Sequence, residues 1–333
     1  MNMLATQEPR LRDFWYCLFP MHELSDAPRA FRLLGQDIVV WRDEDGRPHA
    51  VIDRCPHRSA RLSGGTVEEG RIVCPYHGWA FRGDGRCVSV PQSVTNAGPQ
   101  FGVKALHCTE RYGQVWVCPG EPAFDLPHVP HFEKPGYRQI FEFSEDWACS
   151  AQRIIENEFD TAHFSFVHKG SFGDSDPAPA RTDITETETG FVAELHFAVR
   201  NPEDMRDALQ MHDDNTVRNV ISRFIMPFYQ IAEINYPNGL TNVLVTWLTP
   251  VDDGTTRFNQ FVMRNDREED VPASQVRAFD RRITSEDRQV LELTDPMVPL
   301  DTSEGVEIHM ASDKPGLIMR RRMREFLHGG KKA

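Results

Sequence analysis

The sequence predicts an α+β protein, with a small all-β domain followed by a larger antiparallel sheet flanked by helices. Short apolar runs separated by turn residues fill the first third of the chain, as strands of a small β-domain do. Strand-like runs return between residues 190 and 264. Helical spacing of apolar residues precedes and follows this second group, which indicates helices packed on a sheet.

The first domain is expected over residues 1–140 and the second over 141–333. Strands are predicted at 37–41, 49–52, 71–73 and 114–117, with an Asp-rich turn at 43–46 between the first two. The segment from Phe124 to Pro135 is rich in Pro and His and reads as a linker. This division leaves all four early strands in the first domain.

The second domain is expected to begin with a helix over roughly Trp147–His163, because apolar residues recur there at helical spacing. Strands are predicted at 191–197, 241–248 and 256–263. A second helix is predicted from Pro272, a favoured first helical residue, to about Thr294. A helix held against a large antiparallel sheet is an arrangement of the helix-grip type. The basic run 320–322 is expected on the solvated face of a C-terminal helix.

The composition argues against several classes of protein. Net charge is −13, with 50 acidic against 37 basic residues, so nucleic acid is not an expected partner. The most apolar stretch, Phe224–Ala232, is too short to cross a bilayer. Seven scattered cysteines and no signal-peptide pattern indicate a reducing compartment, and we expect a cytoplasmic protein without membrane contact.

Two loops, one Cys-x-His and the other Cys-x-x-His, form the first candidate metal site. Cys55-Pro56-His57 is separated by 16 residues from Cys74-Pro75-Tyr76-His77, and both loops lie between predicted strands. Two thiolates and two imidazoles also make a zinc set, so zinc is the alternative. A Cys paired with a His in each loop fits better a Rieske 2Fe-2S cluster, in which two His replace two Cys on one iron.

The second candidate site lies at residues 156–168. His163 and His168 are five residues apart and would diverge by roughly 140° on one continuous helix, so a shared metal requires the helix to end or bend between them. Asn157, Asp160 and His163 are spaced three apart and share a helical face.

A third, carboxylate ligand is expected from the later helix. Asp287 falls near the centre of its apolar stripe, where a buried carboxylate without a cation is costly. Asp280 lies towards the same face and is the second choice. Pairing of Asp287 with Arg281 or Arg288 is the structural alternative.

These two motifs together resemble those of the Rieske non-haem iron oxygenases. The resemblance runs over roughly residues 13–325, with CPH…CPYHGWAF for the cluster and N-x-x-D-x-x-H-x-x-x-x-H matched at Asn157, Asp160, His163 and His168. It implies a 2-His-1-carboxylate site for mononuclear Fe(II), with O2 as co-substrate, and places Asn157 near the iron.

The same resemblance implies an assembly and partners. In a head-to-tail homotrimer Asp160 would bridge His77 of one subunit and His163 of its neighbour for electron transfer. The sequence has no dinucleotide fingerprint, so NAD(P)H would act through a separate reductase, with or without a ferredoxin.

The expected reaction is hydroxylation of a C–H bond of a small organic substrate. The segment 166–173 and the C-terminal basic run look like the branch that holds vanillate O-demethylase, dicamba monooxygenase and saxitoxin hydroxylases. O- or N-demethylation with loss of formaldehyde is the alternative, and ring cis-dihydroxylation, a Rieske electron carrier and a two-zinc protein rank lower. The substrate pocket is expected to be lined by Phe166, Met226, Tyr236 and Trp247.

Overall fold

The computed structural model describes residues 2–93, 100–173, 178, 180–201, 203 and 206–329. The chain divides into two compact units. One comprises residues 5–126 and 249–253, and the other residues 1–4, 127–248 and 254–333. The boundary expected near residue 140 falls inside a strand of the second unit, whereas the units part within the Pro- and His-rich segment.

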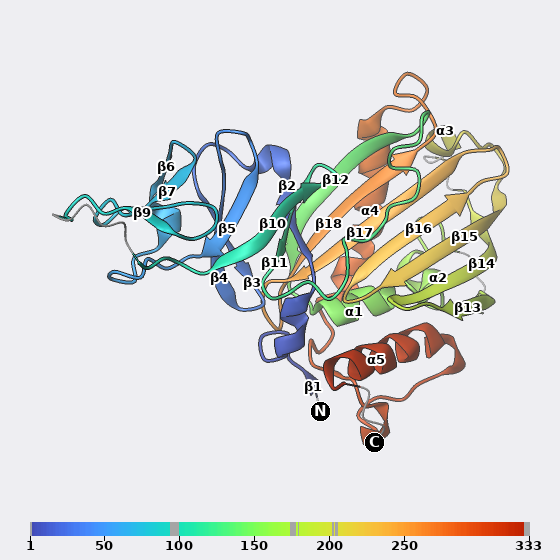
Figure 1. Cartoon of the computed structure of the whole chain (residues 1–333). Helices are drawn as coiled ribbons and strands as arrows, with labels where there is room; N and C mark the ends of the chain where they lie inside the picture. The colour runs from blue at the N-terminus through green and yellow to red at the C-terminus, as the bar shows by residue number, and fades with distance from the viewer. Residues whose placement is uncertain are drawn as a thin grey trace. The chain divides into compact units, whose positions relative to one another are not determined.

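The first unit holds two antiparallel sheets (Figure 1). The six-stranded sheet has the order β2-β11-β10-β5-β4-β3 and the four-stranded sheet the order β6-β7-β8-β9. Their strands are β2 (Tyr16–Pro20), β3 (Arg29–Leu33), β4 (Gln36–Arg42), β5 (Pro48–Ile52), β6 (Thr66–Glu68), β7 (Arg71–Val73), β8 (Ala80–Phe81), β9 (Cys87–Ser89), β10 (Ala105–Arg111) and β11 (Gln114–Cys118). The strands predicted in this third of the chain are confirmed within one residue at most ends.

The second unit is built on a seven-stranded antiparallel sheet of order β12-β18-β17-β16-β15-β14-β13. A short pair, β1 (Asn2–Met3) with β19 (Val298–Pro299), lies outside it. The seven strands are β12 (Arg138–Trp147), β13 (Thr182–Glu186), β14 (Gly190–Arg200), β15 (Asn215–Ile225), β16 (Tyr229–Asn235), β17 (Thr241–Pro250) and β18 (Thr256–Arg264).

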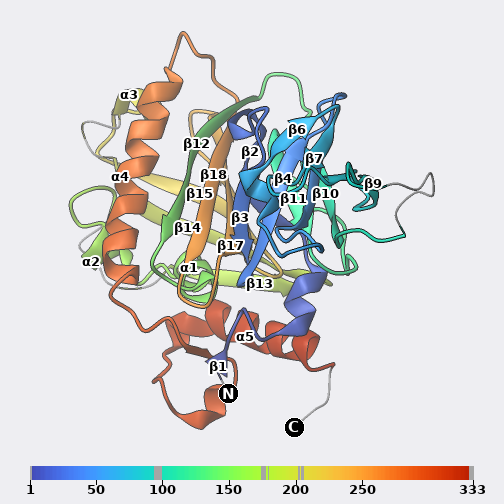
Figure 2. The ribbon, with the colours of Figure 1, turned by 90° about the vertical axis from the view of Figure 1, so that its left-hand side faces the viewer.

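Five α-helices belong to this unit within the described ranges: α1 (Ala151–Asn157), α2 (Phe164–Val167), α3 (Arg206–Leu209), α4 (Ala273–Leu291) and α5 (Lys314–Leu327). Helix α4 runs along one face of the sheet, as Figure 2 shows from the side. Its apolar residues Val276 and Phe279 pack with Ile140, Tyr236 and Val262 of the sheet. The α+β fold class and the helix-on-sheet arrangement are therefore confirmed.

Two sequence expectations in this unit are wrong. The helix expected over Trp147–His163 ends at Asn157, because the Asp160 carboxylate accepts a hydrogen bond from the Ala162 backbone N–H and stabilises a turn instead. Arg320 does not lie on a solvated face of α5. It is 4% exposed, and it forms a bidentate ion pair with Glu156 of α1, at 2.7 Å for both contacts.

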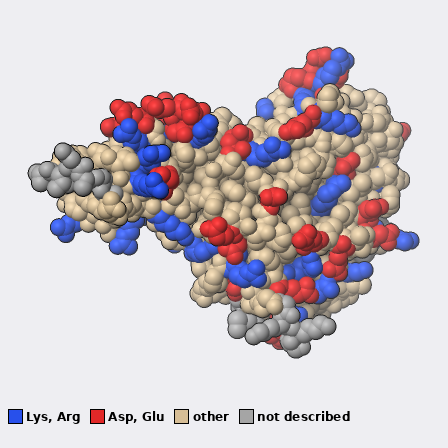
Figure 3. Space-filling view, viewed as in Figure 1, with Lys and Arg blue, Asp and Glu red and all other residues tan. Residues whose placement is uncertain are grey.

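Surface charge agrees with the composition. On the face drawn in Figure 3, acidic and basic side chains are interspersed, and the described residues of that face form no continuous basic patch. None of the helices in the described ranges combines the length and the apolar character needed to span a bilayer.

Candidate functional site

The two Cys-His loops of the first unit have the same backbone geometry. In each loop the Cys N–H donates to the carbonyl five residues later, Cys55 to Ala60 and Cys74 to Trp79, both at 2.8 Å. In each, the N–H four residues after the Cys donates back to the Cys carbonyl at 3.0 Å. Two equivalent tight loops thus present one thiol and one imidazole each.

The residue four positions after each Cys has a left-handed backbone. Its φ is +59° at Ser59 and +73° at Gly78. A Cβ at Gly78 would also lie 3.3 Å from Pro91 Cγ. Backbone angle and space therefore both favour Gly in the second loop, although Ser59 adopts a similar angle in the first.

The four predicted cluster ligands are brought together by these loops. Cys55 and Cys74 are 1% and 2% exposed, and the rings of His57 and His77 lie 4.5 Å apart between centroids. Burial, with Cys74 beside it, raises the pKa of the Cys55 thiol to about 11.

Aromatic contacts hold the imidazoles in place. Trp79 stacks on His57 with centroids 4.5 Å apart and ring planes inclined by 2°. Tyr76 stacks on His77 at 3.9 Å. The buried Nδ1 of His77 has no hydrogen-bond partner among the described residues. Two buried thiols and an imidazole nitrogen left free for a metal fit a 2Fe-2S cluster of the Rieske kind.

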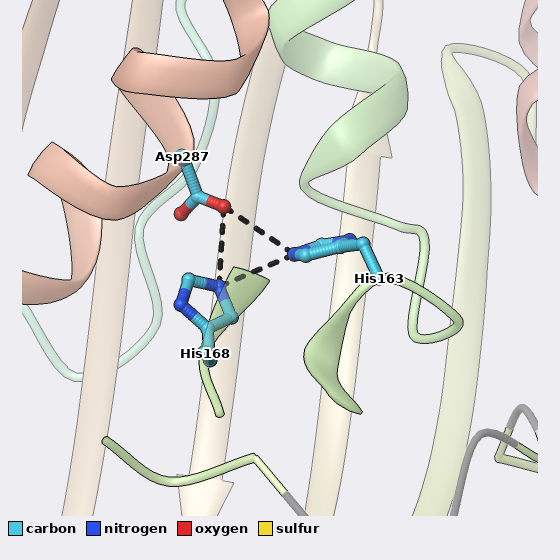
Figure 4. Close-up of side chains that lie close together, drawn as sticks. All are labelled: His163, His168 and Asp287. Carbon is cyan, nitrogen blue, oxygen red and sulfur yellow. Dashed lines mark hydrogen bonds and ion pairs between the residues drawn. The ribbon is translucent and has the colours of Figure 1, made fainter. Parts of the chain in front are cut away.

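The second site lies in the other unit, where His163, His168 and Asp287 converge (Figure 4). His163 Nε2 lies 3.2 Å from His168 Nε2, and Asp287 Oδ1 lies 3.3 and 3.1 Å from these two nitrogens. Ligands about 2.1 Å from one metal ion lie about 3 Å apart, so the triangle fits three ligands on one face of a single ion.

The local chain explains why two histidines five residues apart meet. His163 is the N-cap and His168 the C-cap of α2, which is a single turn. The His168 carbonyl accepts hydrogen bonds from the N–H groups of Ser171 and Gly173, both at 2.9 Å. A Cβ at Gly173 would lie 2.1 Å from the Phe164 carbonyl oxygen, so only glycine fits there.

Second contacts orient both imidazoles. His168 Nδ1 lies 2.7 Å from Glu286 Oε2, which also accepts a 2.7 Å hydrogen bond from Ser171 Oγ. His163 Nδ1 lies 3.5 Å from Asp160 Oδ2 and 3.4 Å from Asn157 Nδ2. These contacts leave both Nε2 atoms directed at Asp287.

The electrostatics of the site favour a cation. Burial opposes a charge on His163, but hydrogen bonds with Asp160 and Asp287 raise its pKa to about 9. Burial also opposes ionisation of Asp287, yet the two histidines hold the pKa of this carboxyl below its ordinary value. Positive charge is thus stabilised at this point, as a metal centre requires.

The two candidate aspartates lie in different surroundings. Asp287 contacts both histidines, whereas Asp280 lies two helical turns earlier and contacts Glu142. Neither Arg281 nor Arg288 pairs with Asp287, because both contact Glu145 instead. The structure therefore supports the first of the sequence alternatives.

A pocket opens beside the three converging side chains, between α4 and the sheet. Its apolar walls include Leu195, Val220, Leu244, Phe279 and Ile283. Its polar lining consists of Asn157, Glu158, Thr161, Thr182, Arg218, Ser222, Gln230, Tyr236, Asn242 and Asp280.

Of the four side chains expected to line this pocket, Tyr236 does so. Trp247 is fully buried against Tyr229, because alternation along β17 turns Asn242 and Leu244 towards the pocket and Trp247 towards the other face. Phe166 is 73% exposed on α2. Met226 lies in the turn between β15 and β16 and is not part of the lining.

The sequence reasoning missed Glu286, Glu158 and the Glu142–Asp280 contact. Glu286 could have been noticed as the acidic neighbour of Asp287. Glu158 lies inside the motif that carries the histidines, and burial, with the charge of Asp287, raises its pKa to about 8. No sequence pattern marked Glu142, because the residues that it contacts, Gln260 and Asp280, are more than 100 positions away in the chain.

Comparisons with known proteins match both parts of the chain to known families. Residues 14–108 match the Rieske 2Fe-2S domain and residues 147–328 match the vanillate O-demethylase oxygenase C-terminal domain. The methylxanthine N1-demethylase NdmA of Pseudomonas putida is 31% identical over 328 residues, covering 95% of this chain and 89% of that protein. A vanillate O-demethylase oxygenase subunit of Pseudomonas sp. (strain HR199) is 28% identical, covering 84% and 85%.

Solved structures show the same fold. NdmA of Pseudomonas putida CBB5 superposes with a TM-score of 0.82 at 27% identity, covering 98% of this chain and 93% of that one. Dicamba monooxygenase bound to 3,6-dichlorosalicylic acid gives a TM-score of 0.84 at 21% identity, covering 97% and 99%.

A Rieske 2Fe-2S domain joined to a catalytic sheet with a converging His-His-Asp set defines a Rieske-type oxygenase, an oxidoreductase. Within that class, the chain belongs to the family whose catalytic part is the vanillate O-demethylase oxygenase C-terminal domain. The resemblance stated from the motifs is thereby confirmed.

Proposed function

We propose that this chain is the terminal component of a multicomponent monooxygenase that hydroxylates a C–H bond of a small organic substrate. The observation that carries the proposal is the triangle of His163, His168 and Asp287, with edges of 3.1–3.3 Å, at the wall of a largely apolar pocket. When bound, mononuclear Fe(II) and the 2Fe-2S cluster supply dioxygen activation and electron storage.

The residues around the triangle have separate tasks in this proposal. His163 and His168 would hold the metal through Nε2 and Asp287 through Oδ1, and the pocket beside these three side chains would receive O2 and substrate. Glu286 accepts the Nδ1 proton of His168 and so fixes its tautomer. Phe159, Phe164 and Phe172 line the pocket near the histidines and exclude water from the reacting carbon.

The cluster residues Cys55, His57, Cys74 and His77 would hold the electron store in the first unit. We assign the transfer between sites to Asp160, whose side chain is 36% exposed while its Oδ2 faces His163 Nδ1. An exposed carboxylate in this position can accept a hydrogen bond from His77 of a neighbouring subunit. In the proposed head-to-tail homotrimer, the cluster of one subunit would lie beside the iron site of the next.

The electrons would come from NAD(P)H through a separate reductase, with or without a ferredoxin. The supporting observation is that the two matched domains account for an electron store and a catalytic site, while the sequence carries no dinucleotide fingerprint.

Demethylation is the second candidate, and the names of the relatives favour it. NdmA is named an N1-demethylase, and the vanillate enzyme an O-demethylase. Hydroxylation of a methyl carbon on N or O gives an unstable hemiaminal or hemiacetal that releases formaldehyde. Both candidates therefore share one chemical step and differ in the substrate.

A panel of N-methyl, methoxy and unsubstituted heteroaromatic compounds with a surrogate reductase tests the proposal. Formaldehyde with demethylated product identifies a demethylase, and a stable alcohol identifies a hydroxylase. The His168→Ala variant should form neither product. Turnover by that variant at the rate of the unsubstituted enzyme would contradict the assigned site.

A further inference from the structure

A pair of acidic side chains, Glu142 and Asp280, lies at the pocket without a part in metal binding. Glu142 occupies a β-bulge of β12, where the register with β18 shifts between Phe141 and Phe143. Glu142 contacts Asp280 of α4, and the next residue, Phe143, lies under the Arg281 guanidinium of the same helix. Bulges commonly redirect a side chain beside a functional site, and this one turns a carboxyl group towards α4.

The two carboxyl groups are in contact and shielded from water. The buried oxygens Glu142 Oε1 and Asp280 Oδ2 have no donor from the described residues, while Gln260 Nε2 donates to Glu142 Oε2 at 2.5 Å. Burial raises the pKa of both groups, and the charge of Asp280 raises that of Glu142 further. Two such oxygens without a donor favour a hydrogen-bond donor supplied by a ligand.

Arg264 lies beside the pair and lowers the pKa of both carboxyls, which opposes the effect of burial. Its guanidinium also forms an ion pair with Asp266, which is 5% exposed and is paired with Arg138 as well.

Asp280 lies on the pocket wall at a distance from the metal triangle. It precedes Asp287 by seven residues on α4, which is about 10 Å along the helix axis. Asn242, which is 6% exposed, lines the same pocket, and its Oδ1 has no partner within the described chain. A buried amide oriented into a pocket without a partner indicates a group of the ligand.

The unpartnered atoms of the pocket lining are mostly acceptors. They are Asp280 Oδ2, Asn242 Oδ1 and Gln230 Oε1. The Nε2 of Gln230 donates to the Glu158 carbonyl at 2.7 Å. The basic side chain of the lining, Arg218, donates through Nη2 to Asn201 and lies over the Tyr236 ring at 5.1 Å. Its Nε is a buried donor without a partner among the described residues, so away from the metal triangle the lining holds three such acceptors and this one donor.

We propose that the substrate carries an N–H group, neutral or cationic, which donates to Asp280 while the oxidised carbon lies at the His163–His168–Asp287 end of the pocket. This assignment rests on the proposed function for the position of the reacting carbon. A substrate with nitrogen donors opposite the oxidised carbon satisfies both ends. A carboxylate at the same end would face the Glu142–Asp280 pair and be disfavoured.

Three isosteric probes test the proposal by calorimetry on the reduced holoenzyme without O2: 3-methoxybenzamidine, 3-methoxybenzamide and 3-methoxybenzoate. The amidine and the amide should bind at least tenfold more tightly than the benzoate. Benzoate binding as tight as amidine binding in the unsubstituted enzyme would overturn the proposal, whatever the behaviour of the variants.

Variants identify the residue that sets the preference. Asp280→Asn should lower amidine affinity about tenfold and remove the preference over benzoate. Glu142→Gln should keep the preference within threefold, because it leaves the Asp280 carboxyl in place. Glu269→Gln is the control, because it also replaces a carboxyl group by an amide, but at an exposed position. It should not change the affinity for any of the three probes. An unchanged preference in a folded Asp280→Asn protein would also overturn the proposal.

The binding measurement and the turnover measurement test the Asp280 assignment and the proposed function separately. A probe that binds with the predicted preference but yields neither formaldehyde nor alcohol with a surrogate reductase would contradict the proposed function and support the Asp280 assignment.

Discussion

The Nδ1 nitrogen of His168 lies 2.7 Å from the Oε2 oxygen of Glu286, the residue that precedes Asp287 on α4. One helix thus supplies both a ligand carboxylate and the carboxylate that orients another ligand. Because consecutive helical residues point about 100° apart, Asp287 can face the histidine Nε2 atoms while Glu286 reaches around to Nδ1. This contact leads to the first prediction.

Replacing Glu286 by Ala should weaken metal binding at the second site roughly 10- to 100-fold, the usual cost of losing an orienting carboxylate. The metal affinity of Glu286→Gln should lie between those of the Ala variant and the unsubstituted protein, since the Gln amide oxygen still accepts the Nδ1 proton. The measurement is the dissociation constant of Co(II) for protein depleted of the mononuclear metal. An Ala variant with the affinity of the unsubstituted protein would show that Ser171 alone suffices to orient His168.

Asp160→Asn should retain both metal sites and lose product formation. The Asn side chain keeps the size and the hydrogen bond to the Ala162 N–H but lacks the charge that the bridging role requires. Visible and EPR spectra, iron content and product yield with a surrogate reductase check this. Normal turnover would exclude Asp160 from electron transfer between subunits.

Arg320→Leu should destabilise the second unit by about 3–5 kcal/mol, because it leaves Glu156 buried without its bidentate partner. For a unit of this size the loss corresponds to a fall in Tm of roughly 6 °C or more. The matched control is Arg321→Leu on the same helix, where the partner pair with Glu186 is about half exposed and worth under about 1 kcal/mol. Equal losses in the two variants would contradict this account of α5.

A second ion pair of Arg320, the one with Glu307, should shape the acid limb of stability. Burial opposes ionisation of Glu307, but hydrogen bonds from Arg320 and Arg153 hold its pKa below the ordinary value. The folded protein therefore gains stability above the unfolded pKa of about 4.3 and loses it as pH falls through the lower folded pKa. Urea unfolding between pH 3 and 6 should show a shallower slope in Arg320→Leu than in Arg321→Leu.

Gly78→Ala should destabilise the second Cys-His loop by about 1–2 kcal/mol, since the residue has φ +73° and its Cβ would approach Pro91. Lower cluster content in the visible spectrum and a lower Tm are the expected readings. Gly64→Ala is the control, because its Cβ would make ordinary contact at 3.8 Å and its φ is not left-handed. Equal behaviour of the two variants would show that the loop tolerates the substitution.

The sequence predicted best what short-range patterns determine. Most strands, the helix from residue 273 and the convergence of His163 with His168 could be expected, because alternation and local spacing decide them. The one-turn helix between the histidines could not, since it depends on the turn made by Asp160.

Long-range geometry was beyond the sequence. Trp247 and Asn242 lie on the same strand and point to opposite faces of the sheet. The sequence around them does not show which of these faces packs against α4. Likewise Arg320 resembled its exposed neighbours, although its buried partner Glu156 lies 164 residues earlier. The choice between Asp280 and Asp287 required the distances to both histidines.

Metal stoichiometry in two variants tests the central claim, that one chain holds a Rieske cluster and a separate mononuclear iron, most directly. The unsubstituted protein should contain about three irons and about two acid-labile sulfides per chain. His168→Ala should contain about two irons and two sulfides with an intact Rieske EPR signal, and Cys74→Ser should lose the sulfide and that signal. A His168→Ala protein that keeps about three irons, or an unsubstituted protein that holds zinc and no sulfide, would contradict the account.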